Sequence, residues 1–481
     1  MELTEEQKII FDKYVSGENI FITGPGGTGK TALIREIYQH AINQEKRIQV
    51  CALTGCAAVL LQCKAKTIHS WAGIGQASGE SQKIIERVIK NKYKRQNWID
   101  TELLIVDEVS MLSKRLFQVL NNIGQRARKR IGIPFGGIQV IFSGDFYQLP
   151  PVGDKEDIET SQFCFESEIW SSLFPKSNQI SLKKIFRQSD PKYANILNQI
   201  REGILKRKSY DILRHQVGKK LEEDIDIQPT KLYPRRYSVE AINSGEMKKL
   251  NTEERIYDMR RETNITATKT KYTNEEIEYE ISYLTASMPC ERSVKLRLGA
   301  QVMCVVNMEI CGYVLCNGSQ GIITDFTEQK LPVVKFHGIP RPITIGYHSW
   351  VSESISCVGV SQIPLILAWA LTIHKAQGAT LELAEIDVGN NIFECGQTYV
   401  ALSRVKSLDG LYLTAFDYTK ILTNKKVKEY YHNLNSGLND DKNNKSVIKT
   451  DKDESSKKEI SSESLQEMQS PTIMDKWLNV K

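Results

Sequence analysis

The sequence predicts an α/β protein built around a parallel sheet that carries a phosphate-binding loop. Residues 24–31 read Gly-Pro-Gly-Gly-Thr-Gly-Lys-Thr; a short apolar run at 19–23 precedes them, and residues 32–41 carry apolar side chains at helical spacing. A strand, a glycine-rich loop and a helix in this order form the context in which such a loop binds a polyphosphate. The alternative is a chance glycine-rich turn before a helix, and the complete pattern disfavours it.

Length and composition bound the class of protein. A chain of 481 residues is long enough for about three domains, and 41% hydrophobic with 25% charged residues is ordinary for a globular protein. No apolar run reaches the ~20 residues needed to cross a bilayer, and the first residues lack a secretory leader. We therefore expect an intracellular protein with no membrane partner, placed in the nucleus or the cytoplasm (a viral replication site included) and not secreted. The ten cysteines include no CxxC pair, which favours free thiols, and the net charge of +6 permits nucleic-acid binding without arguing for it.

The loop itself supplies the first candidate residues. Glycines let backbone N–H groups surround a polyphosphate, and the helix N-terminus adds partial positive charge. Lys30 is expected to reach the β- and γ-phosphates, and the Thr31 hydroxyl to bind Mg²⁺. The expected nucleotide-binding residues here are Gly24, Pro25, Gly26, Gly27, Thr28, Gly29, Lys30 and Thr31.

Gln7 has two interpretations that the sequence leaves open. Thr4 is placed to cap a helix, with Gln7 at the third helical position of a capping box. The amide of Gln7 could instead bind the edge of an adenine, because an amide offers both a donor and an acceptor.

Two further apolar strands end in polar residues. The run at 103–106 leads into Asp107 and Glu108, which we expect to bind Mg²⁺ and to polarise the attacking water, respectively. The run at 138–143 leads into Gly-Asp-Phe-Tyr-Gln-Leu-Pro-Pro-Val, in which Gln148 could sense the γ-phosphate. The aromatic residues of that segment either fill the core or stack on bases. Alternating strands and helices up to this point indicate a doubly wound parallel sheet.

The order of the motifs is similar to that of superfamily 1 helicases, and it most resembles the Pif (petite integration frequency) family of 5′-to-3′ DNA helicases. The resemblance covers roughly residues 1–420, and this many motifs in order exclude coincidence. The segments that carry it are LTEEQ, GPGGTGKT, TGCAA, TIHSW, IVDEVSML and GDFYQLPPV, followed by the region 163–188, LTIHKAQGAT at 371–380 and YVALSRV at 399–405.

This resemblance implies two RecA-like domains with two insertions. Short strands broken by Gly and Asn turns indicate a small barrel, which resembles an SH3-like insertion; an ordinary β-hairpin extension is the alternative. The expected domains are 1–181 (with a small helical, basic subdomain at 73–101), 182–290 together with 362–432, the SH3-like insertion at 291–361, and a tail at 433–481.

The resemblance also implies roles for individual residues, with ATP and Mg²⁺ as cofactors. Gln7 would read adenine, Gly378 would help to bind the nucleotide, and Arg187 and Arg404 would be arginine fingers from the second domain that touch the γ-phosphate. Lys30, Glu108 and Gln148 would complete the catalytic set. Single-stranded DNA would contact Thr54, Thr67, His69, Ser70, His374, Lys375 and Thr380, mainly through phosphates. On residue type alone, His69 is more often a structural histidine.

The tail after residue 433 is rich in Asn, Ser, Lys, Asp and Glu and cannot bury enough apolar surface to fold. Near its end, residues 470–478 gather apolar side chains and are similar to peptides that bind sliding clamps. They depart from that pattern because Ser470 stands where glutamine is usual and Lys476 replaces an aromatic residue. A frayed tail or a short amphipathic helix is the alternative.

The motifs together predict an ATP-driven helicase that moves on single-stranded DNA, separates the duplex at single-strand/duplex junctions, and acts as a monomer in replication, repair or recombination. An RNA or RNA–DNA helicase of the same superfamily remains open. So does a remodelling ATPase that does not unwind, although it would leave the motifs around Arg187, 371–380 and Arg404 unexplained. A DNA-binding factor with a decayed site is disfavoured by the intact catalytic residues.

Overall fold

The computed structural model describes residues 3–444, except positions 76, 155, 222–226, 264–271, 311, 353–354 and 356–357. Residues Met1–Leu434 form one compact unit, and the chain from Asn435 forms a second. The docking peptide predicted at 470–478 lies outside the described residues. Within the described ranges, no helix is both long and apolar enough to cross a bilayer.

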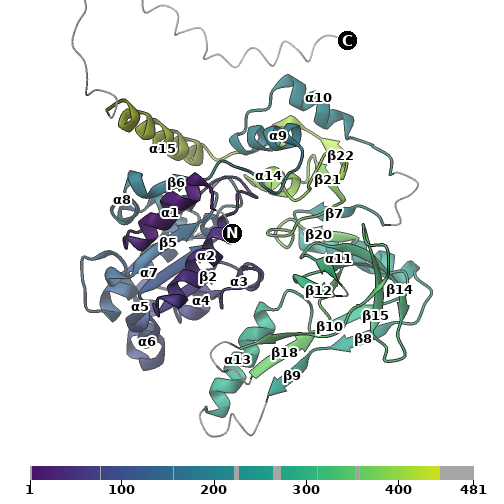
Figure 1. Ribbon diagram of the computed structural model, residues 1–481, viewed down its shortest axis with the longest axis horizontal. Coiled ribbons are helices and arrows are strands. Elements are labelled where there is room, and N and C mark those ends of the chain that lie inside the picture. Colours follow the sequence, from purple (N-terminus) through teal and green to yellow (C-terminus); the bar gives the residue numbers. More distant parts are fainter. Residues whose placement is uncertain are drawn as a thin grey trace, which may run out of the picture. The chain divides into compact units, whose positions relative to one another are not determined.

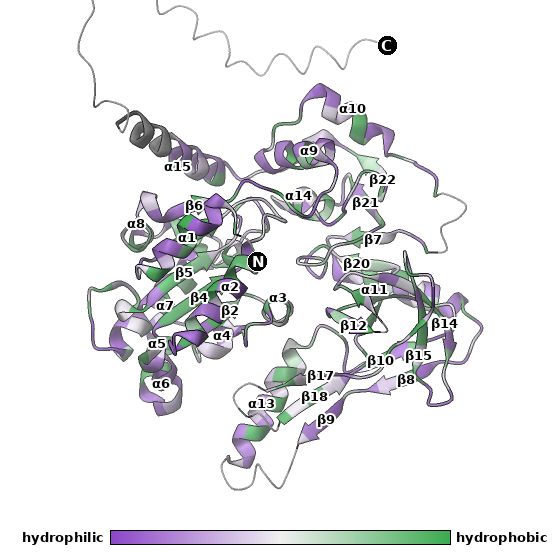
Figure 2. Ribbon diagram, viewed as in Figure 1, coloured by the Kyte–Doolittle hydropathy of each residue, from purple (hydrophilic) through white to green (hydrophobic). Residues whose placement is uncertain are grey.

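A six-stranded sheet in the order β3-β2-β4-β5-β1-β6 forms the centre of the first domain, and all its strands are parallel. β1 and β4 are buried along their whole length because helices cover both faces of the sheet, and Figure 2 shows β4 and β5 as strongly hydrophobic. The carboxyl ends of β4, β5 and β1 therefore meet at one edge. The strands are β1 (Ile20–Thr23), β2 (Ile48–Ala52), β3 (Lys66–Thr67), β4 (Leu103–Asp107), β5 (Gln139–Ser143) and β6 (Gln179–Ser181).

Helices and two apolar clusters enclose this sheet. Alternation along β1 sends Ile20 and Ile22 into one cluster and Phe21 into the other, where it meets Trp170. The basic segment predicted at 73–101 contains α5 and α6, which pack against α7 (Figure 1). The helices are α1 (Glu5–Val15), α2 (Lys30–Asn43), α3 (Gly55–Leu61), α4 (Ile68–Trp71), α5 (Ser81–Lys90), α6 (Lys92–Asp100), α7 (Lys114–Ala127) and α8 (Glu168–Leu173).

The second domain contains a four-stranded parallel sheet in the order β20-β7-β21-β22. Two parallel sheets with flanking helices confirm the predicted fold class. The strands are β7 (Thr230–Tyr233), β20 (Ala370–Thr372), β21 (Ala384–Val388) and β22 (Leu411–Phe416), and the helices are α9 (Pro191–Glu202), α10 (Arg207–His215), α11 (Arg236–Lys249) and α14 (Gln397–Leu402).

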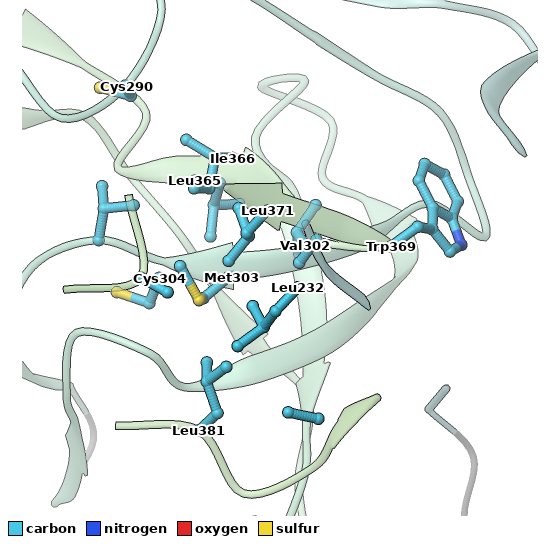
Figure 3. Packing of buried hydrophobic residues seen from close by; sticks show 14 of the residues in the cluster. Leu232, Cys290, Val302, Met303, Cys304, Leu365, Ile366, Trp369, Leu371 and Leu381 are labelled. Carbon is cyan, nitrogen blue, oxygen red and sulfur yellow. The ribbon is translucent and has the colours of Figure 1, made fainter. Parts of the chain in front are cut away.

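Between β7 and β20 the chain forms an antiparallel insertion that shares its core with the second domain. Its main sheet has the order β16-β15-β14-β11-β19. Figure 3 shows Val302 of β11 and Leu365 of β19 beside Leu232 of β7 and Leu371 of β20, all within one buried cluster. The SH3-like character of the insertion stays a prediction. Its elements are β8 (Arg255–Asp258), β9 (Arg260–Thr263), α13 (Asn274–Ser287), β10 (Ser293–Leu296), β11 (Gln301–Cys304), β12 (Met308–Ile310), β13 (Tyr313–Leu315), β14 (Gln320–Phe326), β15 (Pro332–Phe336), β16 (Ile343–Thr344), β17 (His348–Val351), β18 (Val358–Gln362) and β19 (Leu365–Leu367).

The last described element is α15 (Lys425–Asn444). The tail predicted from residue 433 therefore begins inside a helix. Leu434 is only 4% exposed and belongs to the apolar cluster around Phe21, so the folded chain extends beyond the predicted boundary.

Candidate active site

One cavity of about 530 Å³ gathers most of the residues singled out from the sequence. It collects side chains from the carboxyl edge of the first sheet and from the loops around β20 and α14 of the second domain. Of the predicted residues, it is lined by Gly26, Gly27, Thr28, Gly29, Lys30, Thr31, Thr54, Asp107, Glu108, Gln148, Arg187, His374, Gly378, Thr380 and Arg404. Three predicted residues do not line this cavity: Gly24 and Pro25, which begin the loop, and Gln7, which lies beside Gly29.

The glycine-rich loop is held against the segment that follows β6. A Cβ atom on Gly24, whose φ is +134°, would lie 2.3 Å from the carbonyl oxygen of Leu182. The N–H of Phe186 donates to the oxygen of Gly27 across 2.8 Å. Lys30 folds back over the loop, and its Nζ donates to the carbonyl oxygens of Gly24 at 2.7 Å and Pro25 at 2.9 Å. The two carbonyl oxygens accept hydrogen bonds from the same ammonium group that we expect to bind a phosphate.

Two carboxylates face Lys30 from the end of β4. Burial raises the pKa of Asp107, and burial together with the charge of Asp107 raises the pKa of Glu108 to about 7, against the opposing effect of Lys30. Glu108 has a left-handed backbone with φ of 57°, which turns the chain sharply after the strand. Gln377 Nε2 donates to Glu108 Oε2 at 3.0 Å and to Gln148 Oε1 at 3.3 Å. Gln377, from the second domain, thus bridges the two residues expected to handle water and γ-phosphate.

Arg187 lies on the segment that joins the two domains. Its neighbour Phe186 is bonded to the loop, and its other neighbour Gln188 donates to the carbonyl oxygen of Ser403 at 3.3 Å. The resemblance implied that Arg187 comes from the second domain. In the structure it lies between the loop of the first domain and Ser403 of the second, to whose carbonyl oxygen Arg187 Nη1 donates at 3.4 Å. Burial lowers the pKa of Arg187.

Arg404 is 2% exposed and approaches the loop from the end of α14. Its Nη2 would lie 3.6 Å from a Cβ atom on Gly26, and Nη1 of Arg187 would lie 3.5 Å from the same position. Burial and the charge of Arg187 lower the pKa of Arg404 to about 9, against the opposing effect of Glu108. Two guanidinium groups therefore converge on one point of the loop.

The charges around this cavity are not paired with each other. Among the described residues, no ion pair within 4.0 Å involves Lys30, Arg187 or Arg404, whereas the nearby Arg201 is fully paired with Asp145. Cations that are buried or partly buried without carboxylate partners are costly, and a bound polyanion would neutralise them.

Thr31 and Asp107 are suited to hold a Mg²⁺ ion. Both line the cavity, and Asp107 is a buried carboxylate that lacks an ion-pair partner among the described residues. No group of three or more His, Cys, Asp or Glu side chains that could hold a metal occurs in the described chain. Mg²⁺ commonly keeps several waters and binds through one or two protein groups together with phosphate oxygens, so two side chains are enough to hold it.

The structure forms the capping box predicted for Gln7, and the adenine-binding role of Gln7 stays a prediction. The capping box is formed, with Thr4 N–H donating to Gln7 Oε1 at 3.0 Å and Gln7 N–H donating to Thr4 Oγ1 at 3.3 Å. The buried Nε2 of Gln7 has no hydrogen-bond partner among the described residues and would lie 3.0 Å from a Cβ atom on Gly29. Beside it, Phe186 is 47% exposed, with Nζ of Lys184 over its ring at 5.2 Å. An amide donor without a partner and a partly exposed aromatic residue beside the loop form a surface suited to a purine base.

The residues predicted to contact DNA are distributed over several surfaces. Thr54, His374 and Thr380 line the cavity described above, and His374 also lines, together with Lys375, a larger cavity of about 950 Å³ beside α11. His69 lines a third cavity of about 270 Å³, and burial lowers its pKa. Thr67 caps α4 by accepting from Ser70 N–H at 3.2 Å, and its own N–H donates to the hydroxyl of Tyr283 at 3.0 Å.

Four residues of the site were not singled out from the sequence. Gln377 and Phe186 lie inside quoted motifs, so position within a motif could have indicated them. Tyr399 also lies in a motif, and its hydroxyl accepts from Gly26 N–H at 2.9 Å. Tyr283 belongs to the insertion and carries no local sequence signal.

Comparison with known proteins agrees with this geometry. The family model described as PIF1-like helicase matches residues 2–210, and the model described as DNA helicase Pif1, 2B domain, matches residues 281–326. "ATP-dependent DNA helicase Pif1" from Bdellovibrio bacteriovorus is 32% identical, with 90% of this chain and 92% of that protein covered. "ATP-dependent DNA helicase PIF1" from Emericella nidulans is 33% identical over 87% of this chain, and this chain spans 61% of its length.

Solved structures are similar over most of the chain. The crystal structure of Pif1 helicase from Candida albicans is 33% identical with a TM-score of 0.68, covering 90% of this chain and 100% of that one. The crystal structure of Bacteroides sp Pif1 in complex with ADP-AlF4 is 29% identical with a TM-score of 0.71, covering 91% and 98%. The two parallel sheets and the site around the glycine-rich loop define a P-loop NTPase with two RecA-like domains. This chain belongs to the PIF1-like helicase family.

Proposed function

We propose that the chain is an ATP-dependent DNA helicase that moves along single-stranded DNA in the 5′-to-3′ direction. The observation that carries this proposal is the set of three cations without carboxylate partners around the loop, the buried Arg404 and the partly buried Lys30 and Arg187, which face the two carboxylates at the end of β4. MgATP would satisfy both sets of charges at once, because its phosphates are anionic and its metal ion is cationic. The residues come from both domains, so nucleotide binding would draw the domains together.

The hydrolysis step follows from the placement of the side chains. Glu108, bridged by Gln377 to Gln148, would orient and deprotonate the attacking water. Lys30, Arg187 and Arg404 would stabilise the negative charge on the transferring phosphoryl group. Mg²⁺ held by Thr31 and Asp107 would neutralise charge on the β- and γ-phosphate oxygens. Because Arg404 and Gln377 come from the second domain, hydrolysis would proceed only when the domains are closed.

The DNA strand would be held by the residues that surround the site on both domains. Thr54, His374 and Thr380 line the nucleotide cavity, so a change in the bound nucleotide would move the residues that contact the DNA strand. Contacts to phosphates make binding sequence-tolerant and salt-sensitive. Curated relatives are named ATP-dependent DNA helicases, and a Bacteroides Pif1 structure is described as bound to ssDNA, which supports DNA as the substrate.

The decisive experiment measures unwinding of matched DNA duplexes that carry a 5′ or a 3′ single-stranded tail, with and without ATP. We expect ATP-dependent strand separation of the 5′-tailed duplex only. Unwinding of the 3′-tailed substrate would contradict the polarity. A preference for the matched RNA duplex would favour an RNA helicase, and DNA-independent ATP turnover without unwinding would favour a remodelling ATPase.

Gln7→Glu is expected to raise the KM for ATP about five- to tenfold, the effect of losing one buried hydrogen-bond donor to the base. Glutamate still forms a capping box, so the helix start is preserved, while the Nε2 donor is lost. The measurement is the KM for ATP in steady-state turnover, with the unfolding temperature as a control. An unchanged KM for ATP would leave Gln7 with the capping role alone.

Removing residues 445–481 should leave ATP turnover and unwinding unchanged, because the sequence predicts a segment there that cannot fold on its own. The matched variant ends at residue 424 and lacks the buried side chains of α15. It should lose stability and turnover, as judged by thermal unfolding and ATPase assays. An inactive 1–444 chain would show that the tail belongs to the motor. Clamp binding by 470–478 and the monomeric state stay predictions.

A further inference from the structure

Helix α15 follows the last strand of the second domain, yet its apolar face is buried in the core of the first domain. Val427, Tyr431 and Leu434 are 0%, 6% and 4% exposed and belong to the cluster that contains Phe21 and Trp170. Their spacing of four and three residues places them on one face of the helix. The chain thus crosses from the first domain to the second and returns.

The hydroxyl of Tyr431 joins the ends of two neighbouring strands of the first sheet. It lies 2.6 Å from Oγ1 of Thr23, the last residue of β1, directly before the glycine-rich loop. It also accepts from the N–H of Phe146 at 3.2 Å and donates to Oδ1 of Asp145 at 3.5 Å. Asp145 and Phe146 lie just upstream of Gln148, whose N–H donates to the oxygen of Asp145. One hydroxyl therefore touches the base of the loop and the base of the Gln148 segment.

Arg201 from α9 of the second domain completes this cluster. Its Nε and Nη2 donate to the two carboxylate oxygens of Asp145, each at 2.8 Å, and the two side chains are 9% and 0% exposed. The guanidinium lies over the ring of Tyr147 at 4.5 Å and the ring of Tyr431 at 5.2 Å. These two rings are themselves stacked, 4.8 Å apart and 11° from parallel. A bidentate pair with planar stacking fixes orientation as well as distance.

We propose that Tyr431 and Arg201 are positioning residues that lock the ends of β1 and β5 to the second domain and so couple domain closure to the glycine-rich loop and Gln148. The proposal rests on the helicase function proposed above. Neither residue lines the nucleotide cavity. Both act through Asp145. A domain movement that displaces α9 would shift the Asp145 carboxylate, which Arg201 binds, and Asp145 is only three residues before Gln148 in the chain.

The first variant is Tyr431→Phe in the full chain, which removes the hydroxyl and keeps the stacked ring. The expected result is a kcat for single-stranded-DNA-stimulated ATP turnover lowered about five- to tenfold, as for loss of one buried hydrogen-bonding group, with the KM for ATP within about twofold of wild type. The matched control is Tyr430→Phe. Tyr430 is the adjacent residue of the same helix, and its hydroxyl donates to Gln179 Oε1. It should keep the wild-type kcat.

The second variant, Arg201→Lys, retains the charge but loses the bidentate geometry, and it should lower kcat in the same way. The double variant with Tyr431→Phe should lose little more than the worse single variant, because the two residues act as one unit. The proposal is overturned if Tyr431→Phe and Arg201→Lys both retain the wild-type kcat, if Tyr430→Phe reduces kcat equally, or if the two effects simply multiply. An inactive wild-type chain would instead contradict the helicase function itself.

Discussion

Lys30→Ala is expected to abolish DNA-stimulated ATP hydrolysis. The ammonium of Lys30 is the cation set deepest in the loop, and in this structure only backbone carbonyls and one threonine hydroxyl of the same loop bind it. A phosphate would replace those weak partners with a charged one, so the interaction strengthens as charge moves on the transferring group. Removing a single preorganised donor of this kind lowers kcat by about 10²- to 10³-fold. The measurement is the ATP turnover rate with saturating single-stranded DNA.

The matched control for this variant is Lys425→Ala, which removes a lysine whose side chain is 91% exposed on α15. Lys425 forms only an exposed ion pair with Glu429, and such a pair contributes little to stability. The variant should therefore keep wild-type turnover. Circular dichroism and thermal unfolding should show that Lys30→Ala is folded. Turnover retained in Lys30→Ala would show that the glycine-rich loop is not the hydrolysis site.

Most of the site's first-domain half could be predicted because each of its residues lies within a few positions of a recognisable element. Lys30 follows a glycine-rich turn, Asp107 ends an apolar strand, and Gln148 follows another, so local sequence and the parallel-sheet rule already bring them to one edge. The same reasoning predicted β1, β4 and β5 to within one residue of their observed bounds.

The residues that were missed depend on contacts between distant parts of the chain. Gln377 is 269 residues from Glu108, and Tyr431 is 408 residues from Thr23. Such pairs leave no periodicity or spacing in the sequence. The predicted tail boundary at residue 433 lies two residues from the division of the chain after Leu434, and only the packing of α15 in the cluster with Phe21 and Trp170 explains why Leu434 is buried. Packing against distant residues, and not local composition, therefore buries this part of α15.

Arg404→Ala is expected to remove ATP turnover while leaving nucleotide binding nearly intact. Arg404 reaches the loop only from the second domain, so its charge contributes to the closed, reacting state rather than to the initial binding of ATP by the first domain. Arginine fingers contribute about 10³- to 10⁵-fold to kcat, and a loss in that range is expected here. Binding of a fluorescent ATP analogue and ATP turnover, measured on the same preparation, separate the two effects. Loss of binding itself would contradict the finger role.

Arg404→Met tests whether this loss comes from the missing charge or from a damaged core. Arg404 is among the largest fully buried side chains, so alanine leaves a cavity, whereas methionine fills most of the space. The guanidinium is buried beside Arg187, and burial together with the charge of Arg187 lowers its pKa to about 9. Methionine removes the cost of burying this charge, and this gain offsets the loss of the hydrogen bonds that the guanidinium donates to Val400 O and Ser403 Oγ. We therefore expect Arg404→Met to be inactive with an unfolding temperature equal to or above that of wild type.

A destabilised Arg404→Met would show that Arg404 supports the fold, and the loss of turnover could then not be assigned to a finger. A stable but inactive variant would show that the charge of Arg404 is needed for ATP turnover and not for the fold.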